Sequence, residues 1–455
     1  MRRKTEMNNK IKMLLFCLAT ASSLYAQIIN APLLHPFFEK LIALETKKNG
    51  KVSIVHIGDS HIQPDYLTNA VRQPLQQKFG DGGRGFIFPY TLNKQVATRP
   101  YYFASNATWQ ICRNNQPFKC ESGTEFGLSG YGFSTKAEQF VFLVEAREGI
   151  HNFNTIKIVS ATASLYRLAT VDGNKKPITY SEKPSVNTHV VKRGETLDII
   201  AKNYNVSAAA IKEENKMKSN SVHAGKKLRI PITLIETSVD TSMFRPLEYQ
   251  LQEPFVSMYH QEKPISAIYF FPTKKQNLYS LNGLIVEKDT PGLIYHNIGT
   301  VGSMASNFNA NPLFFEQFPI LKPDLVIISL GTNESFNAVT TEKYIENMEL
   351  FINNIRKFCP DVPVLITTPP ISLLPGRKFN TYILEYTHAL FKKDNIALWD
   401  LYSFLSGLMG PEKNLAAIKI TGDKVHYTME GYIDQGTAFA NDFLNEYEHY
   451  KQNRK

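Results

Sequence analysis

The stretch "IVHIGDSHIQPD", residues 54–65, decides the fold that the sequence predicts. A continuous apolar run of strand type ends at Gly58, and a helical pattern begins at Asp65. Glycine permits a tight turn, and the carboxyl end of a buried parallel strand is where open α/β sheets bind ligands. We therefore expect Ser60 at a ligand crevice, at the start of the next helix. Serine is also a favoured helix N-cap, so this stretch alone leaves both interpretations open.

Three further apolar runs resemble that strand and alternate with helical stretches. The runs are "PDLVIISLG" (323–331), "VPVLITTPP" (362–370) and "NIALWDL" (395–401), and the helical stretches are 65–79, 340–358 and 381–394. Strands alternating with helices are typical of a parallel sheet covered by helices on both faces. We predict such a three-layer α/β/α domain, made of residues 27–90 and 290–455.

The middle of the chain has a different pattern. Segments such as "EQFVFLVEA" and "NTIKIVSAT" alternate apolar and polar residues, which indicates half-buried antiparallel strands. We predict an inserted β domain of residues 91–186 and 233–289, possessing a further module of residues 187–232. Aromatic residues of the insertion, Tyr101, Tyr102 and Trp109, could stack on sugar rings, but we expect them to pack within the fold.

The further module has its own motifs. It contains G-E-T-L, I-A, an asparagine and G-x-x-L-x-I-P, with helical spacing in "TLDIIAKNY". These positions resemble a LysM module. The resemblance implies a βααβ fold that binds glycans containing N-acetylglucosamine, such as peptidoglycan or chitin. A packing module without a ligand is the alternative. We expect the flanking segments "SEKPSVN" and "ITLIETSVDTS" to be linkers.

Residues 1–26 have the features of a secretory signal. A basic segment precedes the short apolar stretch "MLLFCLATASSLYA", and small or polar residues follow at Ala26 and Gln27. Cleavage there would lower the net charge from +10 to about +6. We expect an exported chain, periplasmic or extracellular, with no membrane anchor and no nucleic-acid partner. Export would permit a disulfide between Cys112 and Cys120, although free thiols remain the alternative.

Four segments together supply the groups needed for acyl transfer. Ser60 would be the nucleophile, His426 its general base, and Asp423 the group that orients the histidine. The backbone N–H groups of Ser60 and Gly302 and the side chain of Asn333 would form the oxyanion hole. This set needs no metal and no cofactor.

The same segments resemble the SGNH, or GDSL-type, esterase superfamily. "GDSH", "NIGTVG", "GTNE" and "DKVH" follow the order of its four motifs, with His61 in place of Leu and Glu334 in place of Asp. The resemblance implies a flavodoxin-like fold. Peptidoglycan O-acetylesterases of the superfamily share the GDSH form and an inserted β module, which implies 6-O-acetyl N-acetylmuramic acid as substrate. An esterase for another acetylated polysaccharide and an inactive glycan-binding protein are the alternatives.

Several other residues have weaker signals. Arg84, in the glycine-rich stretch "FGDGGRGFIFPY", and His61 could form a substrate rim. His56 lies within the apolar strand, so we expect a hydrogen-bonded core histidine. Asp59 could cap the turn, since the D-x-x-H segment supplies a better triad acid.

Overall fold

The computed structural model describes residues 28–93, 100–162, 165–171, 177–204, 206–273, 276–376 and 378–454. The predicted signal, residues 1–26, lies outside this part of the chain. The chain divides into two compact units, one made of Met1–Leu168 with Leu247–Lys455 and one of Ala169–Pro246. Each unit is described by itself.

The α/β domain of the first unit is built on a six-stranded sheet in the order β1-β23-β20-β19-β2-β18. Its strands are β1 (Ile28–Ile29), β2 (Lys51–Gly58), β18 (Gly292–Gly299), β19 (Leu325–Ser329), β20 (Val364–Thr367) and β23 (Ala397–Trp399). All pairings are parallel except that of the short edge strand β1 with β23. The five parallel strands follow the flavodoxin-like order, whose switch point lies between β2 and β19.

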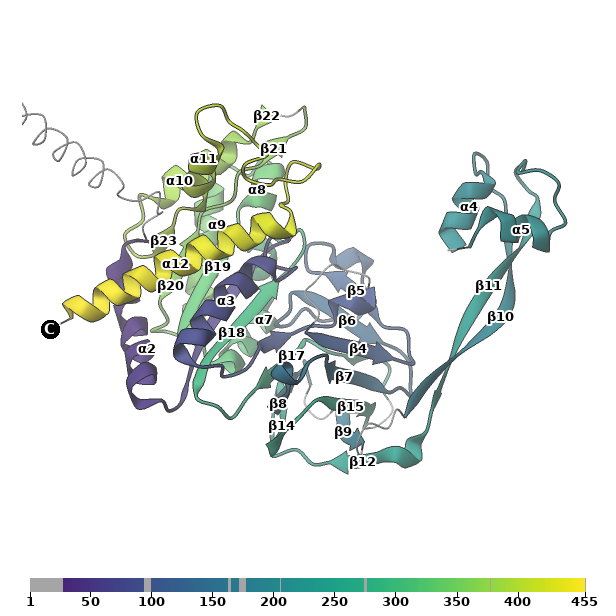
Figure 1. Ribbon diagram of the computed structural model, residues 1–455, viewed down its shortest axis with the longest axis horizontal. Helices are drawn as coiled ribbons and strands as arrows, with labels where there is room; N and C mark the ends of the chain where they lie inside the picture. Colours follow the sequence, from purple (N-terminus) through teal and green to yellow (C-terminus); the bar gives the residue numbers. More distant parts are fainter. Residues whose placement is uncertain are drawn as a thin grey trace, which may run out of the picture. The chain divides into compact units, whose positions relative to one another are not determined.

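Helices cover both faces of this sheet, as predicted. One face packs against α2 (His35–Lys47), α3 (Tyr66–Phe79), α11 (Leu401–Met409) and α12 (Met429–Asn453). The other face packs against α6 (Ala305–Asn309), α7 (Pro312–Gln317), α9 (Thr341–Phe358) and α10 (Thr381–Leu390). Figure 1 shows α3 and α12 side by side over the sheet. The domain is completed by short elements: α8 (Thr332–Phe336), the hairpin of β21 (Leu373–Leu374) and β22 (Lys378–Phe379), and two 3-10 helices (Ala31–Leu34, Phe318–Leu321).

The β insertion of the first unit contains three antiparallel sheets. One includes β9 (Tyr166–Val171), β15 (Ala267–Pro272), β7 (Phe142–Ala146) and β4 (Tyr101–Ser105) in that order. The second has the order β13 (Leu251–Glu253), β14 (Val256–Ile265), β8 (Phe153–Val159), β17 (Gly283–Glu287) and β3 (Gly85–Ile87). The third joins β16 (Tyr279–Ser280), β6 (Tyr131–Thr135) and β5 (Gln110–Arg113). Short 3-10 helices lie at Tyr90–Asn93, Pro117–Lys119 and Gly149–His151.

The insertion and the α/β domain share one hydrophobic core. Aromatic side chains of the insertion form a continuous buried cluster with the α6–α9 face of the central sheet. Strand β3 lies inside the predicted α/β segment 27–90, yet it pairs with β17 of the insertion. The insertion therefore begins a few residues earlier than the sequence pattern suggested.

The second unit has the βααβ order expected for a LysM module. Strands β10 (Ile178–Val190) and β11 (Lys227–Val239) pair along their whole length and flank α4 (Leu197–Tyr204) and α5 (Ala208–Glu214). A small core of Val191, Leu197, Ile200, Ala201, Ile211, Leu228 and Ile230 holds the helices on the strands. The unit also contains a 3-10 helix at Thr241–Met243 and most of β12 (Phe244–Leu247).

One expectation about this unit is wrong. We expected the flanking segments "SEKPSVN" and "ITLIETSVDTS" to be linkers, but residues 181–187 lie in β10 and residues 232–239 lie in β11, and the two strands pair. The second segment is rich in the β-branched residues Ile, Thr and Val, which favour strands, whereas the first segment has only Val186 and pairs with the second all the same. Because the two ends of the module leave it as neighbouring strands, the ladder simply continues beyond the module.

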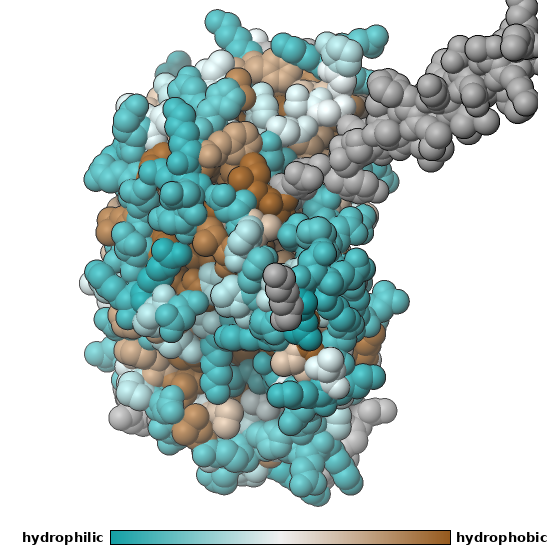
Figure 2. Space-filling view, turned by 90° about the vertical axis from the view of Figure 1, so that its left-hand side faces the viewer, coloured by the Kyte–Doolittle hydropathy of each residue, from teal (hydrophilic) through white to brown (hydrophobic). Residues whose placement is uncertain are grey.

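The surface is mixed in character. Figure 2 shows a face on which hydrophilic residues predominate and hydrophobic ones are interspersed. Among the helices of the described segments, none combines the length and the hydropathy needed to span a membrane.

Candidate active site

Ser60, His426 and Asp423 meet at the carboxyl edge of the central sheet. Ser60 lies in the turn after β2, while the other two precede α12. The Nε2 atom of His426 is 2.8 Å from the Ser60 Oγ atom, and its Nδ1 atom is 2.7 Å from Asp423 Oδ2. These distances match the hydrogen bonds that join a nucleophile, a base and the group that orients the base.

Asp423 is held as a carboxylate. Burial raises its pKa, but hydrogen bonds from the Thr421 hydroxyl, from His426 and from the Val425 backbone N–H outweigh this effect. The pKa of Asp423 therefore lies well below its usual range. About half of the Asp423 side chain and two fifths of the His426 side chain are exposed, so this pair faces solvent.

The turn that bears Ser60 precedes the helix and does not start it. Backbone N–H groups of Ile62 and Gln63 donate to the carbonyl of Asp59, and α3 begins only at Tyr66. A Cβ atom on Gly58 would lie 2.3 Å from Ile62 Cγ1 and 2.8 Å from the Ser329 carbonyl. Glycine is required there by close packing. The expected position of Ser60 at the helix start and its N-cap interpretation are therefore both wrong, because five residues separate Ser60 from the first residue of α3.

The candidate oxyanion donors come from two further loops. Gly302 follows β18 with a φ of +79°, a conformation that favours glycine. Asn333 lies at the start of α8, after β19. Among described residues, no acceptor pairs with the Ser60 or Gly302 backbone N–H. The Asn333 Nδ2 atom donates to Asp59 Oδ2 (3.0 Å) and to the Ser303 carbonyl (3.1 Å), so an oxyanion would have to share one of these hydrogens.

Two buried carboxyl groups tie these loops together. Asp59 Oδ1 accepts from the His61 backbone N–H at 2.9 Å, while its other oxygen holds Asn333. Glu334 Oε1 accepts from the Ala305 N–H at 2.9 Å, which links α8 to the loop after β18. Burial raises the pKa of Asp59 to about 7, helped by the nearby Glu334, and burial also raises the pKa of Glu334 to about 7. Asp59 thus positions Asn333, a role that its place in the turn did not indicate.

The β insertion supports the Gly302 loop. The Val301 backbone N–H donates to the Tyr131 hydroxyl oxygen at 2.9 Å. The Thr300 hydroxyl donates to the Ser129 carbonyl at 2.9 Å, and the Ser303 hydroxyl donates to Asn114 Oδ1 at 2.5 Å. The insertion is therefore part of the site's framework.

A cleft of about 620 Å³ opens beside Ser60 and His426. Tyr66, Tyr427 and Tyr432 of the α/β domain line it, together with Val301. The opposite wall comes from the insertion, through residues of the segment 111–119. A polymer segment carrying an ester could reach the serine hydroxyl through this opening.

The structure corrects the expected substrate rim, because neither His61 nor Arg84 lines this cleft. His61 is buried, its Nδ1 atom lies 3.0 Å from the Tyr432 hydroxyl, and burial lowers its pKa to about 3. Its ring lies 5.3 Å from the His426 ring, so it packs beneath the base.

Arg84 belongs to a buried group that we call the Asp65 cluster. Its members are Asp65, Thr68, Arg72, Arg84 and Asn297. The Asp65 carboxylate forms ion pairs with both arginines and accepts from Asn297 Nδ2 at 2.9 Å. Burial raises the Asp65 pKa, but the two guanidinium groups hold that pKa well below its usual range. The cluster fixes the residue that precedes α3, and its arginines serve structure.

Expectations about packing are confirmed for three side chains and wrong for one. His56 is buried, with its ring nitrogens 2.8 Å from the Tyr295 hydroxyl and 2.7 Å from Ser329 Oγ. Trp109 is partly buried and stacks on Phe133 at 4.7 Å, against the core of the insertion. Tyr101 is buried as expected, whereas Tyr102 is exposed.

Comparison with protein families identifies the two domains. The model described as GDSL-like Lipase/Acylhydrolase matches residues 275–439, and the LysM domain model matches residues 189–231. The chain contains a GDSL-type acylhydrolase domain and a LysM domain. It is thereby a carboxylic ester hydrolase, as the four motifs predicted. No curated protein sequence matches the chain.

One solved structure has a similar overall fold, and others match smaller parts of the chain. A peptidoglycan O-acetylesterase matches with a TM-score of 0.55 and 18% identity, over 91% of this chain and 96% of its own. A carbohydrate esterase family 3 protein from Talaromyces cellulolyticus covers 35% of this chain and 73% of its own, with 17% identity and a TM-score of 0.27. A lipase/acylhydrolase from Enterococcus faecalis covers 34% and 77%, with 21% identity and a TM-score of 0.27.

Proposed function

We propose that this chain is an exported serine esterase that removes O-acetyl groups from peptidoglycan, with 6-O-acetyl N-acetylmuramic acid as its substrate unit. The observation that supports the reaction is the hydrogen-bonded series Ser60–His426–Asp423 at the edge of an open cleft. A serine hydroxyl becomes nucleophilic when a neighbouring base accepts its proton.

In this mechanism, the Ser60 Oγ atom attacks the acetyl carbon while His426 Nε2 takes its proton. Asp423 keeps the histidine in the correct tautomer and stabilises the imidazolium. The carbonyl oxygen becomes an oxyanion that accepts from the Ser60 and Gly302 backbone N–H groups and from Asn333. The imidazolium then protonates the sugar oxygen, which leaves as an alcohol. Water, activated by His426, releases acetate from the acyl-enzyme.

Two features favour peptidoglycan as the polymer. The LysM domain supplies a second attachment to the glycan, which raises the local concentration of substrate without any change in the triad. The match to the peptidoglycan O-acetylesterase extends over the insertion as well as the α/β domain. We propose that LysM binds the N-acetylglucosamine-containing strand while the cleft receives the acetyl group.

The direct test is acetate release from O-acetylated peptidoglycan, acetylated xylan and 4-nitrophenyl acetate, with Ser60→Ala as the matched variant. We expect release from peptidoglycan by the native chain and none above background by the variant. Turnover of xylan alone would overturn the substrate assignment. Equal release by both proteins would exclude the serine mechanism.

LysM and export have separate tests. Deletion of residues 188–231 should reduce retention on insoluble peptidoglycan while leaving hydrolysis of 4-nitrophenyl acetate unchanged. Unchanged retention would contradict the anchoring role.

For export, mass spectrometry of the mature protein should find an N-terminus near Gln27; an intact leader in the purified native protein would contradict it.

A further inference from the structure

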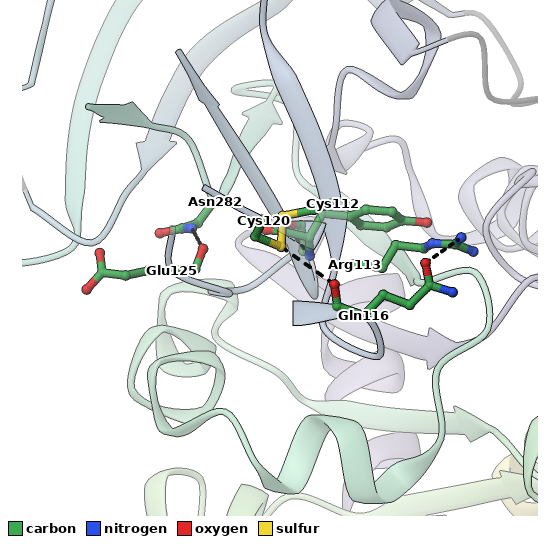
Figure 3. The surroundings of a disulfide bond; sticks show 8 residues. Cys112, Arg113, Gln116, Cys120, Glu125 and Asn282 are labelled. Atoms are coloured by element: carbon green, nitrogen blue, oxygen red, sulfur yellow. Dashed lines mark hydrogen bonds between the residues drawn. A yellow bond between two sulfur atoms is a disulfide. The ribbon is translucent and has the colours of Figure 1, made fainter. Parts of the chain in front are cut away.

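A short disulfide-closed segment of the insertion forms one wall of the active-site cleft. Cys112, at the end of β5, is bonded to Cys120, and the enclosed residues turn through the 3-10 helix Pro117–Lys119. Figure 3 shows the side chains of Arg113 and Gln116 extending together, away from the disulfide. The cross-link restricts the segment, so these side chains project from a constrained backbone.

The charged side chains of this wall are both positive. Arg113 and Lys119 both line the cleft that contains Ser60 and His426. No aspartate or glutamate lies among the lining residues. Within the described part of the chain, neither cation forms an ion pair, in contrast to Arg72 and Arg84 of the Asp65 cluster. The cleft therefore presents two uncompensated positive charges beside the nucleophile.

Arg113 is oriented by neutral groups only. Its Nη1 atom donates to the Val301 carbonyl at 3.4 Å, and its Nη2 atom donates to Gln116 Oε1 at 3.3 Å. A guanidinium has five N–H donors, so three remain for a ligand. The planar guanidinium can donate two parallel hydrogen bonds to the two oxygens of a carboxylate. Since Val301 directly precedes Gly302, the guanidinium also lies next to the loop of the candidate oxyanion hole.

We propose that Arg113, assisted by Lys119, binds a carboxylate of the substrate and thereby places the acetylated sugar at Ser60. This inference rests on the proposed function. N-acetylmuramic acid differs from N-acetylglucosamine by a lactyl group, which ends in a free carboxylate where no peptide is attached. Where a peptide stem is attached, the stem supplies carboxylates instead. Arg113 is thus a specificity residue for an anionic glycan.

The test measures binding of three sugars to the full chain by calorimetry: N-acetylmuramic acid, its lactyl primary amide, and N-acetylmuramoyl-L-alanine. The amide replaces the carboxylate with an uncharged group of nearly the same size that is not an ester, and the alanine derivative moves the carboxylate outward. Variants are Arg113→Gln and Lys119→Gln, with Arg147→Gln as control, because Arg147 is exposed on the insertion over Tyr102 and outside the cleft. LysM is identical in all proteins, so differences between them report on the cleft.

We expect the native chain and Arg147→Gln to prefer the acid over the amide about tenfold, the size of one charge-assisted contact. Arg113→Gln should lose that preference and Lys119→Gln should weaken it. Retention of the preference in Arg113→Gln, or equal or undetectable binding of acid and amide by the native chain, would overturn the proposal. An Arg113-dependent preference for the alanine derivative would assign the carboxylate to the peptide stem. If the native chain kept the preference but released no acetate from peptidoglycan, only the proposed function would be overturned.

Discussion

Two polar clusters flank the turn after β2, and they differ in burial more than in composition. The triad Ser60–His426–Asp423 opens onto the cleft, with its histidine and aspartate partly exposed. The Asp65 cluster is largely buried, and its carboxylate is paired with Arg72, which is buried, and with Arg84, whose side chain is 11% exposed. An aspartate beside cationic or basic partners thus stabilises the turn in one place and, in the proposed mechanism, orients a base in the other. Access to solvent separates the two roles.

The largest expected effect is on the triad. Replacing Ser60 with Ala removes the nucleophile, so kcat for ester hydrolysis should fall at least about 10³-fold. The side chain is small and lies in a turn, so stability should not change. Initial rates with 4-nitrophenyl acetate and denaturant unfolding would check both parts. A variant that unfolds more easily would show that Ser60 has a structural role like that of Asp65.

The second-largest expected effect is a loss of stability when Asp65 is replaced. Asp65→Asn leaves Arg72 and Arg84 without a buried counter-charge, which typically costs about 3–5 kcal/mol of unfolding free energy. Both tryptophans, Trp109 and Trp399, lie in the first unit, so tryptophan fluorescence follows that unit alone.

Asp423→Asn is the matched control for Asp65→Asn. Because Asp423 is half-exposed, this change should leave unfolding nearly unaffected and lower kcat strongly by disturbing the tautomer of His426. If Asp65→Asn were as stable as the native chain, the structural role of the Asp65 cluster would be refuted.

The pH dependence of stability should have opposite signs at Asp65 and Asp59. The fold lowers the pKa of Asp65, so Asp65 stabilises the folded state at pH values above its pKa in the unfolded chain, near 4, and this stabilisation is lost as the pH falls further. The fold raises the pKa of Asp59 to about 7, so Asp59 contributes to the stability of the folded state below pH 4, and this contribution is lost as the pH rises towards 7.

The Asp59→Asn variant tests the second of these signs. Asparagine carries no charge to bury, so the variant should lose less stability than the native chain between pH 4 and pH 8. The difference should be on the order of a few kcal/mol, measured by urea unfolding at both values. Parallel pH curves for the two proteins would show that Asp59 does not ionise in this range.

The smallest effect concerns the support of the Gly302 loop. Tyr131→Phe leaves the Val301 backbone N–H without its acceptor, which typically costs about 1–3 kcal/mol of stability. We expect a several-fold decrease in kcat with little change in KM, because the loop supplies an oxyanion donor. Tyr279→Phe, in the core of the same insertion, is a control for general loosening. Equal kinetic effects of the two substitutions would count against a specific role for Tyr131.

The sequence predicted the parts of the site that depend on local pattern. Apolar runs located β2 and β19, the "NIGTVG" motif located the loop after β18, and parallel strands bring their carboxyl ends to one edge. Ser60, Gly302 and Asn333 therefore lie on neighbouring loops. His56 was recognisable as a core residue for the same reason, since it lies inside a buried run.

The sequence did not predict contacts between side chains that are far apart along the chain. Arg84 lies in a glycine-rich stretch, which suggested a loop at the edge of the substrate site. Its partner Asp65 lies nineteen positions earlier, and the two residues become close only through the helix between them. Arg113 carried no local signal, because it reaches the cleft through the folding of the insertion. The role of Asp59 depends on Asn333, which is 274 positions away.

The most direct test of the central claim is the chemical reactivity of the hydroxyl at position 60. A serine-directed sulfonyl fluoride, followed by peptide mass spectrometry, should modify Ser60 alone and abolish hydrolysis of 4-nitrophenyl acetate. His426→Ala should prevent the modification, since the serine then lacks its base. Equal modification of the His426→Ala variant, or full activity of a chain modified at Ser60, would contradict the account.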